Sequence, residues 1–455
     1  MLIKEFKIDK SSLELFENFI NDDYPIFLDS QRDEKTLGRY SVIASNPFIK
    51  VKSKNGEFTV IEKDKVIREN TKSTLRELTK LLDRYKVEYN GELPFIGGAI
   101  GHFSYELLHE IEKIDIEQED DLNIPDFNFG IYNEIVLIDH LEDKKYIIVN
   151  DFSGDSEKRL KELEDKIQRT TVIEDIFYDV DVEIKNSISK DEYFKAINEV
   201  KNNIEVGNLY QINYTQRFEA LLNKSPFTLY KRLRSTNKAP FASYFDFEEY
   251  QVASCSPERF IRVKNRKIDT RPIKGTIARG KTNKEDDENR KILENSKKDQ
   301  SELLMIVDLE RNDLGKISKT GSVKVRDLFH IEEYATVFQQ VANVEGELKE
   351  NINIEDIIRA TFPGGSITGA PKIRAMELIG ELEKTTRNIY TGSIGYIGFN
   401  GDMDLNIVIR TILCKENKGY YQVGGGIVWD SDAQLEYEES LLKGKALMEA
   451  LLWKK

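Results

Sequence analysis

The sequence predicts an α+β fold built from antiparallel sheets. Short strand-like segments, bounded by turn residues, occur in both halves of the chain. In the second half, long helical patterns separate pairs of such segments instead of alternating with single strands. Regular alternation of strand and helix is typical of parallel sheets, so its absence favours antiparallel pairing. The chain has 455 residues, 39% of them hydrophobic, which is enough to bury a large core.

The first 150 residues are predicted to consist mainly of short strands. Turn residues separate these segments, which have the apolar and β-branched content that strands favour. Two amphipathic patterns interrupt them and predict helices over Ser11–Ile20 and Thr74–Tyr85. The strand-like segments are Ile26–Asp29, Ser41–Ile43, Phe48–Lys52, Phe58–Glu62 and Ile135–Asp139.

A highly charged stretch divides the chain. Residues 151–187 contain many acidic and basic side chains, no proline and only one glycine. This composition is typical of a solvated helix followed by a connector. We therefore expect an N-terminal subdomain over residues 1–185 and a second domain over residues 186–455.

The second domain opens with a clear helix signal. Ser189 and Glu192 have the spacing of a capping box, and Gly207 supplies a C-terminal stop. A strand with alternating faces follows at Tyr210–Thr215. The remaining predicted elements are strands over Gly392–Ile397, Asp404–Leu413 and Tyr420–Val423, and helices over Lys284–Leu309, Pro371–Lys384 and Ala433–Leu451.

Composition excludes several classes of function. There are 67 Lys and Arg against 81 Asp and Glu, a formal charge of −14, so we expect no nucleic-acid partner. No apolar run approaches the roughly 18 residues of a membrane span, and the N-terminus lacks the apolar region of a secretory signal. Two cysteines and four histidines make a disulfide framework or a cysteine- or histidine-based metal site improbable. The sequence thus predicts a cytoplasmic protein whose chemistry rests on Lys, Glu, Asp and Arg.

Two predicted helices each carry a pair of carboxylates at helical spacing. Asp299 and Glu302 are three residues apart, as are Glu436 and Glu439. Residues at this spacing share a helix face, so two such faces in opposition would form an oxygen site suited to Mg²⁺. Because 33% of the chain is charged, a solvated surface is the simpler alternative.

Two glycine-rich segments are candidate anion sites. Gly424–Gly426 follows a predicted strand, and its amides could hold a carboxylate. Gly364–Pro371 leads into a helix, whose N-terminus favours an anion. Neither segment has the Lys-Ser/Thr of a phosphate-binding P-loop, and tight turns between sheet and helix explain both equally well.

Two basic residues are candidates for binding or catalysis. Arg410 shares a predicted strand face with Asp404, Asn406 and Val408, and it could hold a carboxylate in bidentate fashion or pair with a neighbouring acid. Lys274 lies between Pro272 and Gly275 in a predicted strand-to-turn segment. A lysine acts as a nucleophile only if burial or a nearby cation lowers its pKa by several units, and most lysines are solvated surface residues.

Five blocks of sequence stand out by their order and spacing: Ala253–Phe260, Arg271–Thr276, Glu302–Asp313, Phe362–Lys372 and Gly424–Glu439. Together they closely resemble the chorismate-utilising enzymes, the family of anthranilate, aminodeoxychorismate, isochorismate and salicylate synthases. The resemblance covers essentially residues 186–455 and is looser in the N-terminal part, at Leu28–Ser30 and Gly38–Ser41.

The resemblance implies a fold and a metal site. The fold is that of anthranilate synthase component I: two large antiparallel sheets packed as a sandwich, with helices outside and the active site between the sheets. Glu302 and Glu439 resemble the family's Mg²⁺ ligands, with Glu436 and Asp299 close by or bridged by water. The ion would hold the ring carboxylate of chorismate, and Lys443 resembles a residue that neutralises the same carboxylate.

Other positions resemble the family's substrate contacts. Arg410, Tyr390 and the amides of Gly424 and Gly426 resemble the groups that hold the enolpyruvyl carboxylate. Thr276 resembles a further contact.

Three positions resemble catalytic residues of the family and indicate which reaction the protein is expected to catalyse. Glu258 resembles the general acid that protonates the departing C4 hydroxyl. Gln211 stands where water-adding members have a lysine base, and ammonia needs no base, so the resemblance implies amination. Lys274 stands where 2-aminating members typically have alanine, and it resembles the nucleophile of the 4-aminating members. The expected product is 4-amino-4-deoxychorismate, for p-aminobenzoate and folate synthesis.

One position departs from the family pattern. Gln339 replaces a histidine that many relatives carry, and Ala342 replaces a serine. In anthranilate-type members the histidine lies near the ring and is implicated in loss of pyruvate. Its replacement fits an enzyme that stops at the amino-chorismate.

The resemblance also implies partners. Neither Cys255 nor Cys414 lies in the glycine-rich elbow of a glutaminase, so we expect ammonia to come from a separate glutamine amidotransferase subunit. Ser30 resembles the regulatory serine of relatives that bind tryptophan. Two alternatives stay open: an anthranilate synthase component I, which aminates C2 and eliminates pyruvate, and a catalytically silent module that senses an amino acid.

Overall fold

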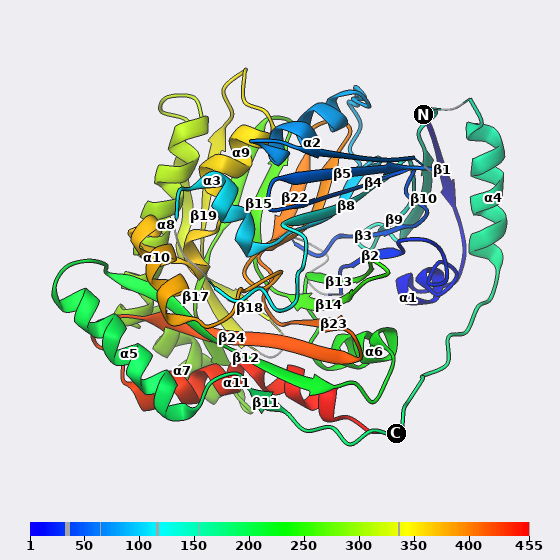
Figure 1. Ribbon diagram of the computed structural model, residues 1–455. Coiled ribbons are helices and arrows are strands. Elements are labelled where there is room, and N and C mark those ends of the chain that lie inside the picture. Colours follow the sequence, from blue (N-terminus) through cyan, green and yellow to red (C-terminus); the bar gives the residue numbers. More distant parts are fainter. Residues whose placement is uncertain (32–36, 64, 115–117, 153, 335–336, 455) are drawn as a thin grey trace.

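Two antiparallel sheets of 12 strands each form the centre of the computed structural model (Figure 1). The structure describes residues 1–31, 37–63, 65–114, 118–152, 154–334 and 337–454. Every pairing between neighbouring strands of a sheet is antiparallel, which confirms the predicted α+β fold.

The first sheet carries strands from both ends of the chain. Its spatial order is β1 (Leu2–Phe6), β10 (Lys144–Val149), β9 (Glu134–Asp139), β3 (Tyr40–Ala44), β2 (Ile26–Asp29), β13 (Phe241–Asp246), β14 (Gln251–Ser256), β23 (Thr411–Lys415), β24 (Lys418–Ile427), β12 (Gln211–Leu221) and β11 (Lys185–Asn186), with β20 (Gly369–Ala370) paired to β12.

The second sheet is assembled in the same mixed way. Its order is β17 (Ile273–Ala278), β19 (Val337–Glu347), β16 (Lys267–Arg271), β15 (Arg259–Lys264), β22 (Met403–Asn406), β21 (Ser393–Gly398), β7 (Gly98–Phe103), β8 (Phe127–Tyr132), β4 (Ile49–Lys54), β5 (Glu57–Glu62) and β6 (Lys65–Asn70), with β18 (Lys324–Glu333) paired to β19. In each sheet, strands from before and after residue 185 are hydrogen-bonded to one another, as in β2 with β13 and β7 with β21. The division at residue 185 stays a prediction.

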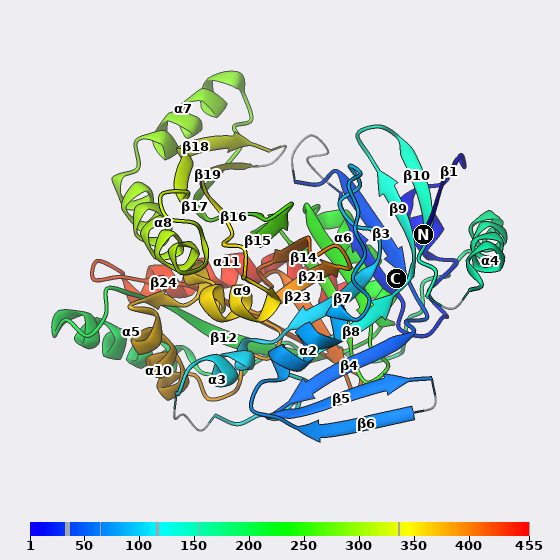
Figure 2. The same ribbon diagram turned by 90° about the horizontal axis from the view of Figure 1, so that it is seen from above.

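Helices cover the outside of the sheets, as Figures 1 and 2 show. On the first sheet α11 packs against β24, and on the second sheet α8 packs against β19. The helices are α1 (Ser12–Phe16), α2 (Thr74–Asp83), α3 (Leu108–Ile111), α4 (Ser156–Gln168), α5 (Lys190–Glu205), α6 (Pro226–Thr236), α7 (Asn283–Glu294), α8 (Lys297–Ile317), α9 (Ile354–Thr361), α10 (Lys372–Leu382) and α11 (Ala433–Leu452), with short 3₁₀ turns at Tyr105–Leu107 and Gly365–Ile367.

Apolar residues fill the space between the sheets. One buried cluster joins Ile26 and Val42 of the first sheet to Ile100 and Ile394 of the second. A second cluster packs the outer face of the first sheet against the helices, through Leu15 among others. Burial of these surfaces, at roughly 25 cal/mol per Å² of apolar area, stabilises the sandwich.

The capping box predicted at the start of the second domain is confirmed. Ser189 Oγ accepts a hydrogen bond from the Glu192 amide, and the Glu192 carboxylate accepts one from the Ser189 amide. Helix α5 then runs to Glu205. The strand predicted at Tyr210–Thr215 is present as the longer strand β12.

Three predicted elements are wrong in extent. The predicted strand Asp404–Leu413 is two strands, β22 and β23, in different sheets, because the chain crosses between the sheets after Asn406. Arg410 lies in this crossing with a φ of 52°, so it does not share a strand face with Asp404. The predicted helix Lys284–Leu309 is two helices, because Ser296 caps a new one. Helix α1 ends at Phe16 and not at residue 20.

Candidate active site

The glycine-rich segment of β24 forms the floor of the candidate site. A Cβ atom on Gly426 would lie 2.4 Å from Gln211 Nε2 and 3.6 Å from Lys274 Nζ. A Cβ atom on Gly425 would lie 3.3 Å from Glu436 Oε2 and 3.5 Å from Lys443 Nζ. A side chain at Gly426 would therefore displace Gln211, and polar groups from β12, β17 and α11 lie against this short stretch of β24.

Lys274 lies among acidic and basic groups from four parts of the chain. Burial lowers the pKa of the Lys274 ammonium, against the opposing effect of the Glu302 carboxylate. Lys443 lowers it further, whereas Glu258 and Glu439 raise it. The structure thus brings together five predicted site residues that are as many as 185 positions apart, from Glu258 to Lys443.

Glu258 has the surroundings expected of a general acid. Its side chain is 7% exposed, and burial raises the pKa of the carboxyl to about 7. Ser366 Oγ donates a 2.8 Å hydrogen bond to Glu258 Oε1, and the Lys274 charge partly offsets the effect of burial. A carboxyl with this pKa holds its proton for much of the time at neutral pH.

The three predicted metal ligands lie on facing helices. Burial raises the pKa of Glu302 on α8, and the charge of Glu436 on α11 adds to this increase. Ser431 Oγ donates a 2.7 Å hydrogen bond to Glu436 Oε1. Although burial favours the neutral form of Glu439, Lys443 Nζ at 2.8 Å lowers the pKa of that carboxyl.

These carboxylates fit an ion that takes part of its coordination from elsewhere. Over the residues that the structure describes, no three His, Cys, Asp or Glu side chains gather closely enough to hold a metal by themselves. Mg²⁺ usually binds through one or two carboxylates and completes its shell with water and substrate oxygens. The like charges of Glu302 and Glu436 are what such an ion would neutralise. Asp299, the fourth predicted member, packs against Gly275.

Gln211 occupies the position predicted to separate amination from hydration. It is 1% exposed, and within the part of the chain that the structure describes its buried Oε1 atom has no hydrogen-bond partner. Its Nε2 points towards Gly426. A buried amide oxygen without a partner costs about 1–3 kcal/mol, and a donor that reached this atom would remove that cost.

Arg410 is a half-buried guanidinium in a strained backbone conformation. Its φ of 52° is unusual for an arginine, and such strain clusters at functional sites. Among the described residues its guanidinium forms no hydrogen bond or ion pair. Burial lowers the pKa of Arg410, next to Cys255. A substrate carboxylate would supply the missing charge partner.

The other predicted substrate contacts lie on several different elements. Tyr390 is buried, which raises its pKa far above the ordinary value. Thr276 is exposed on β17, opposite Gln339 of β19. The carbonyl oxygen of Gly424 accepts a 3.1 Å hydrogen bond from Lys443 Nζ. In the described structure, β23 pairs with Lys418–Tyr420 of β24 and not with the glycine segment that follows. That edge of the glycine segment is therefore free of β23, and its amides could donate hydrogen bonds to a carboxylate.

Sequence reasoning missed three residues of this region. Ser366, which donates a hydrogen bond to Glu258, lies in the glycine-rich segment that the sequence offers as an anion site or a tight turn, and no role is predicted there for its hydroxyl. Glu383 and Arg387 form a buried ion pair behind the site, with N–O distances down to 2.6 Å. A Glu and an Arg four residues apart usually mark a solvated helix face, so their burial left no signal in the sequence.

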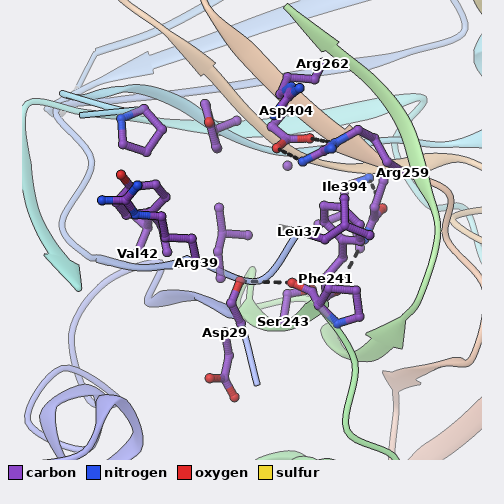
Figure 3. Close-up of a pocket in the computed structure, with 18 of the residues that line it drawn as sticks. Asp29, Leu37, Arg39, Val42, Phe241, Ser243, Arg259, Arg262, Ile394 and Asp404 are labelled. Carbon is purple, nitrogen blue, oxygen red and sulfur yellow. Dashed lines mark hydrogen bonds and ion pairs between the residues drawn. The ribbon is translucent and has the colours of Figure 1, made fainter. Parts of the chain in front are cut away.

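A cavity of about 290 Å³ lies between the sheets near Ser30 (Figure 3). Ser30 Oγ donates a 2.9 Å hydrogen bond to Pro240 O, and the Ser30 amide donates to Ser41 Oγ. On another wall, Arg259 binds the Asp404 carboxylate through two hydrogen bonds of 2.9 and 2.8 Å. The cavity is separate from the group around Lys274, and its lining combines charged and apolar side chains.

Comparison with known proteins places this geometry in a family. The sequence profile of the chorismate binding enzyme family matches residues 24–449, so the chain belongs to this family. It is 39% identical over 422 residues to aminodeoxychorismate synthase component 1 of Bacillus subtilis, which covers 91% of this chain and 89% of that protein. It is 35% identical over 458 residues to anthranilate synthase component 1 of Acetivibrio thermocellus, which covers 97% and 93%.

The solved structures agree with the sheet architecture. The crystal structure of anthranilate synthase component I from Streptococcus pneumoniae TIGR4 matches with a TM-score of 0.81 at 34% identity, over 91% of this chain and 93% of that one. This match confirms the predicted sandwich fold. In the ranges that the structure describes, we find no helix long and apolar enough to cross a membrane.

The raised pKa of Glu258 predicts a pH-dependent stability. Its folded-state pKa of about 7 lies above the ordinary 4.5, so the wild type loses stability as pH rises through this window. In the Glu258→Gln variant the amide that replaces the carboxyl cannot ionise between these two pH values. The free energy of unfolding of the variant relative to wild type should rise by about 3 kcal/mol between these two pH values and stay constant above them. Urea titrations at several pH values measure this, and a difference independent of pH would contradict the assignment.

Proposed function

We propose that the protein aminates chorismate at C4 and forms 4-amino-4-deoxychorismate, the reaction of an aminodeoxychorismate synthase component I. The observation that supports this most directly is that Lys274, partly buried, and Glu258, buried, influence each other's pKa within one site. Burial lowers the pKa of the amine and raises that of the carboxyl to about 7, so each moves towards the form that the reaction needs.

The proposed reaction has two displacements. The neutral amine of Lys274 forms a bond to C2, the ring double bond shifts, and the C4–oxygen bond breaks. Glu258 gives its proton to the departing hydroxyl, which leaves as water. Ammonia then attacks C4, the double bond shifts back, and the bond between Lys274 and C2 breaks. The nitrogen at C4 loses a proton to the Glu258 carboxylate, which restores the starting enzyme.

Substrate binding is assigned to the groups around this pair. Arg410, Tyr390 and the free edge of Gly424 and Gly426 would hold the enolpyruvyl carboxylate. Thr276 supplies a further contact. A guanidinium without a partner among the described residues is the strongest support for this placement, because it gains its hydrogen bonds only when a carboxylate arrives.

A magnesium ion is proposed for the ring carboxylate. Glu302 and Glu439, with Glu436 close by, would hold it, and Lys443 would add a positive charge to the same end of the substrate. When bound, the ion would screen the substrate carboxylate from these acids and orient it.

Ammonia is proposed as the nitrogen donor. Gln211 cannot remove a proton from water, but its buried Oε1, which has no partner among the residues described, can accept a hydrogen bond from an N–H of ammonia. Burial raises the pKa of Cys414 to about 12 and raises that of Cys255 further, so neither thiol is suited to attack glutamine. A separate glutamine amidotransferase subunit is therefore proposed as the source of ammonia.

Amination at C2 with loss of pyruvate, as in anthranilate synthase component I, is the second candidate. Two similar proteins, from Acetivibrio thermocellus and Streptococcus pneumoniae, carry that name. Lys274 argues against it, because direct attack of ammonia on C2 needs the space that the lysine side chain fills. Gln339 at the site edge argues in the same direction.

Product analysis tests the choice between these two reactions. With chorismate, Mg²⁺ and ammonium salts at alkaline pH, the wild type should form the 4-amino product but should not use glutamine alone. Lys274→Ala should reduce this product at least about 100-fold, since covalent catalysis is lost, and should release traces of 2-amino-2-deoxyisochorismate. Liquid chromatography with mass spectrometry identifies each product. Anthranilate from the wild type would establish the second candidate instead.

Magnesium dependence tests the carboxylates. Glu302→Gln and Glu439→Gln keep side-chain shape but remove one charge each, so activity should fall about 100-fold or more and the half-saturating Mg²⁺ concentration should rise. Asp308→Asn, at an exposed position of α8, is the matched control and should leave both unchanged. Ordinary activity at ordinary Mg²⁺ in both glutamine variants would remove these residues from the site.

The cavity next to Ser30 is proposed to bind tryptophan. Its volume of about 290 Å³ lies near the lower end for small-molecule sites. Millimolar tryptophan should raise the melting temperature of the wild type, and Ser30→Ala should weaken this effect by loosening the contact with Pro240. Ser45→Ala, outside the cavity lining, is the control. Equal responses to tryptophan and leucine, or none, would exclude the assignment.

A further inference from the structure

Arg387 is buried behind the candidate active site, and every N–H group of its guanidinium donates a hydrogen bond. The side chain is 1% exposed. A guanidinium has five N–H donors, and five hydrogen bonds leave this one. Its acceptors are Glu383 Oε2 at 2.8 Å, Glu383 Oε1 at 2.6 Å, Asn213 O at 2.6 Å, Ile367 O at 3.0 Å and Thr391 Oγ1 at 3.3 Å.

Glu383 connects the same guanidinium to β12. Its Oε1 atom accepts hydrogen bonds from the Thr215 amide at 3.0 Å and from Thr215 Oγ1 at 2.9 Å. Both oxygens also bind Arg387. A buried charge pair is stable only when its remaining donors and acceptors are satisfied, and here they are satisfied by backbone and side-chain groups of other segments.

Three of these segments lead directly to catalytic groups. Asn213 lies two residues after Gln211 on β12. Ile367 follows Ser366, whose hydroxyl donates to Glu258.

The third segment is the turn that carries Tyr390. Thr391 has a φ of 60°, a strained value for a β-branched residue. Its hydroxyl accepts from Arg387 and donates a 2.6 Å hydrogen bond to Tyr390 O, and the Tyr390 amide donates to Arg387 O. A strained turn persists only when its surroundings hold it, and Arg387 is part of those surroundings.

We infer that the Glu383–Arg387 pair is a positioning device that sets the relative placement of Gln211, Glu258 and Tyr390. The inference rests on the proposed function for the roles of those three groups. Arg387 itself does not bind substrate, because all five of its donors are occupied. This separates it from Arg410, whose guanidinium has no hydrogen bond or ion pair among the described residues.

Only an arginine can make this connection. Lysine has one nitrogen with three donors and cannot reach three carbonyl or hydroxyl groups and two carboxylate oxygens from a single point. Arg387→Lys therefore keeps the charge but releases at least one segment. A displacement of about 1 Å in an active site can cost about 100-fold in rate, so the expected effect falls on kcat.

The chain contains a matched control pair. Glu355 and Arg359 on α9 have the same four-residue spacing, with an N–O distance of 2.9 Å. Arg359 also connects its helix to two other segments, through hydrogen bonds to Glu110 O and Ser73 Oγ, and both of these segments belong to the N-terminal part of the structure. Arg359→Lys and Glu355→Gln therefore measure how much stability is lost when such an ion pair is weakened away from the catalytic residues.

The experiment measures kcat, the KM for chorismate and the melting temperature of the four variants and the wild type. We expect Arg387→Lys and Glu383→Gln to lower kcat about 100-fold with less than about 5-fold change in KM. We expect Arg359→Lys and Glu355→Gln to lower the melting temperature by a similar amount without a change in kcat. If Arg387→Lys does not fold, Glu383→Gln provides the test, since it retains the arginine and the shape of the residue 383 side chain.

Two results would overturn the inference. One is a kcat within about 3-fold of wild type for a folded Glu383→Gln or Arg387→Lys protein. The other is a parallel loss of kcat and melting temperature in both pairs, which would make the ion pair merely structural. Rates are followed as chorismate consumption, so a different amino product from the wild type would contradict the proposed function and leave the test of Arg387 intact.

Discussion

The pairing of β12 with β24 is the constraint on which the candidate site depends. Its register places Asn213 opposite Gly426 and Thr215 opposite Gly424. Because the facing residues of β24 are glycines, the side chains of Gln211, Lys274 and those of α11 can approach the strand backbone closely. A methyl group in place of Gly426 would overlap the Gln211 amide at 2.4 Å. The same strand thus provides sheet hydrogen bonds on one edge and open space above its surface.

Burial of charge controls the chemistry that this space can perform. Lys274, Glu258 and Glu302 have lost much of their water, so the neutral form of each is favoured. Each group therefore depends on its neighbours for its charge state. A site of this kind responds strongly to one arriving carboxylate or cation, because screening by solvent is weak. The ionisation states of the catalytic groups and substrate binding are coupled for this reason.

The two sheets also tie the ends of the chain together. Strand β2 pairs with β13, and β7 pairs with β21, so the first 150 residues are hydrogen-bonded into the same sheets that carry the candidate site residues. The cavity near Ser30 lies within this shared region. A ligand there would touch strands that continue towards the site, since Arg259 follows Glu258 directly and also lines the cavity.

The sequence by itself determined much of the local structure and was enough to name the candidate site residues. The capping box of α5, strands such as β2 and the long helix α11 depend on neighbouring residues, so periodicity and cap residues were sufficient to predict them. Lys274 and Glu258 could be named because they stand in characteristic blocks, and Gln211 and Arg410 because single positions resemble those of the family.

Only the tertiary structure decided that the segment from Asp404 to Leu413 crosses between two sheets, since alternation looks the same in either. It also decided that Glu383 and Arg387 are buried and that Gln211 Oε1 and the Arg410 guanidinium lack hydrogen-bond partners within the described residues. Burial and hydrogen-bond satisfaction depend on segments far apart in the chain, and no local pattern of residues encodes them.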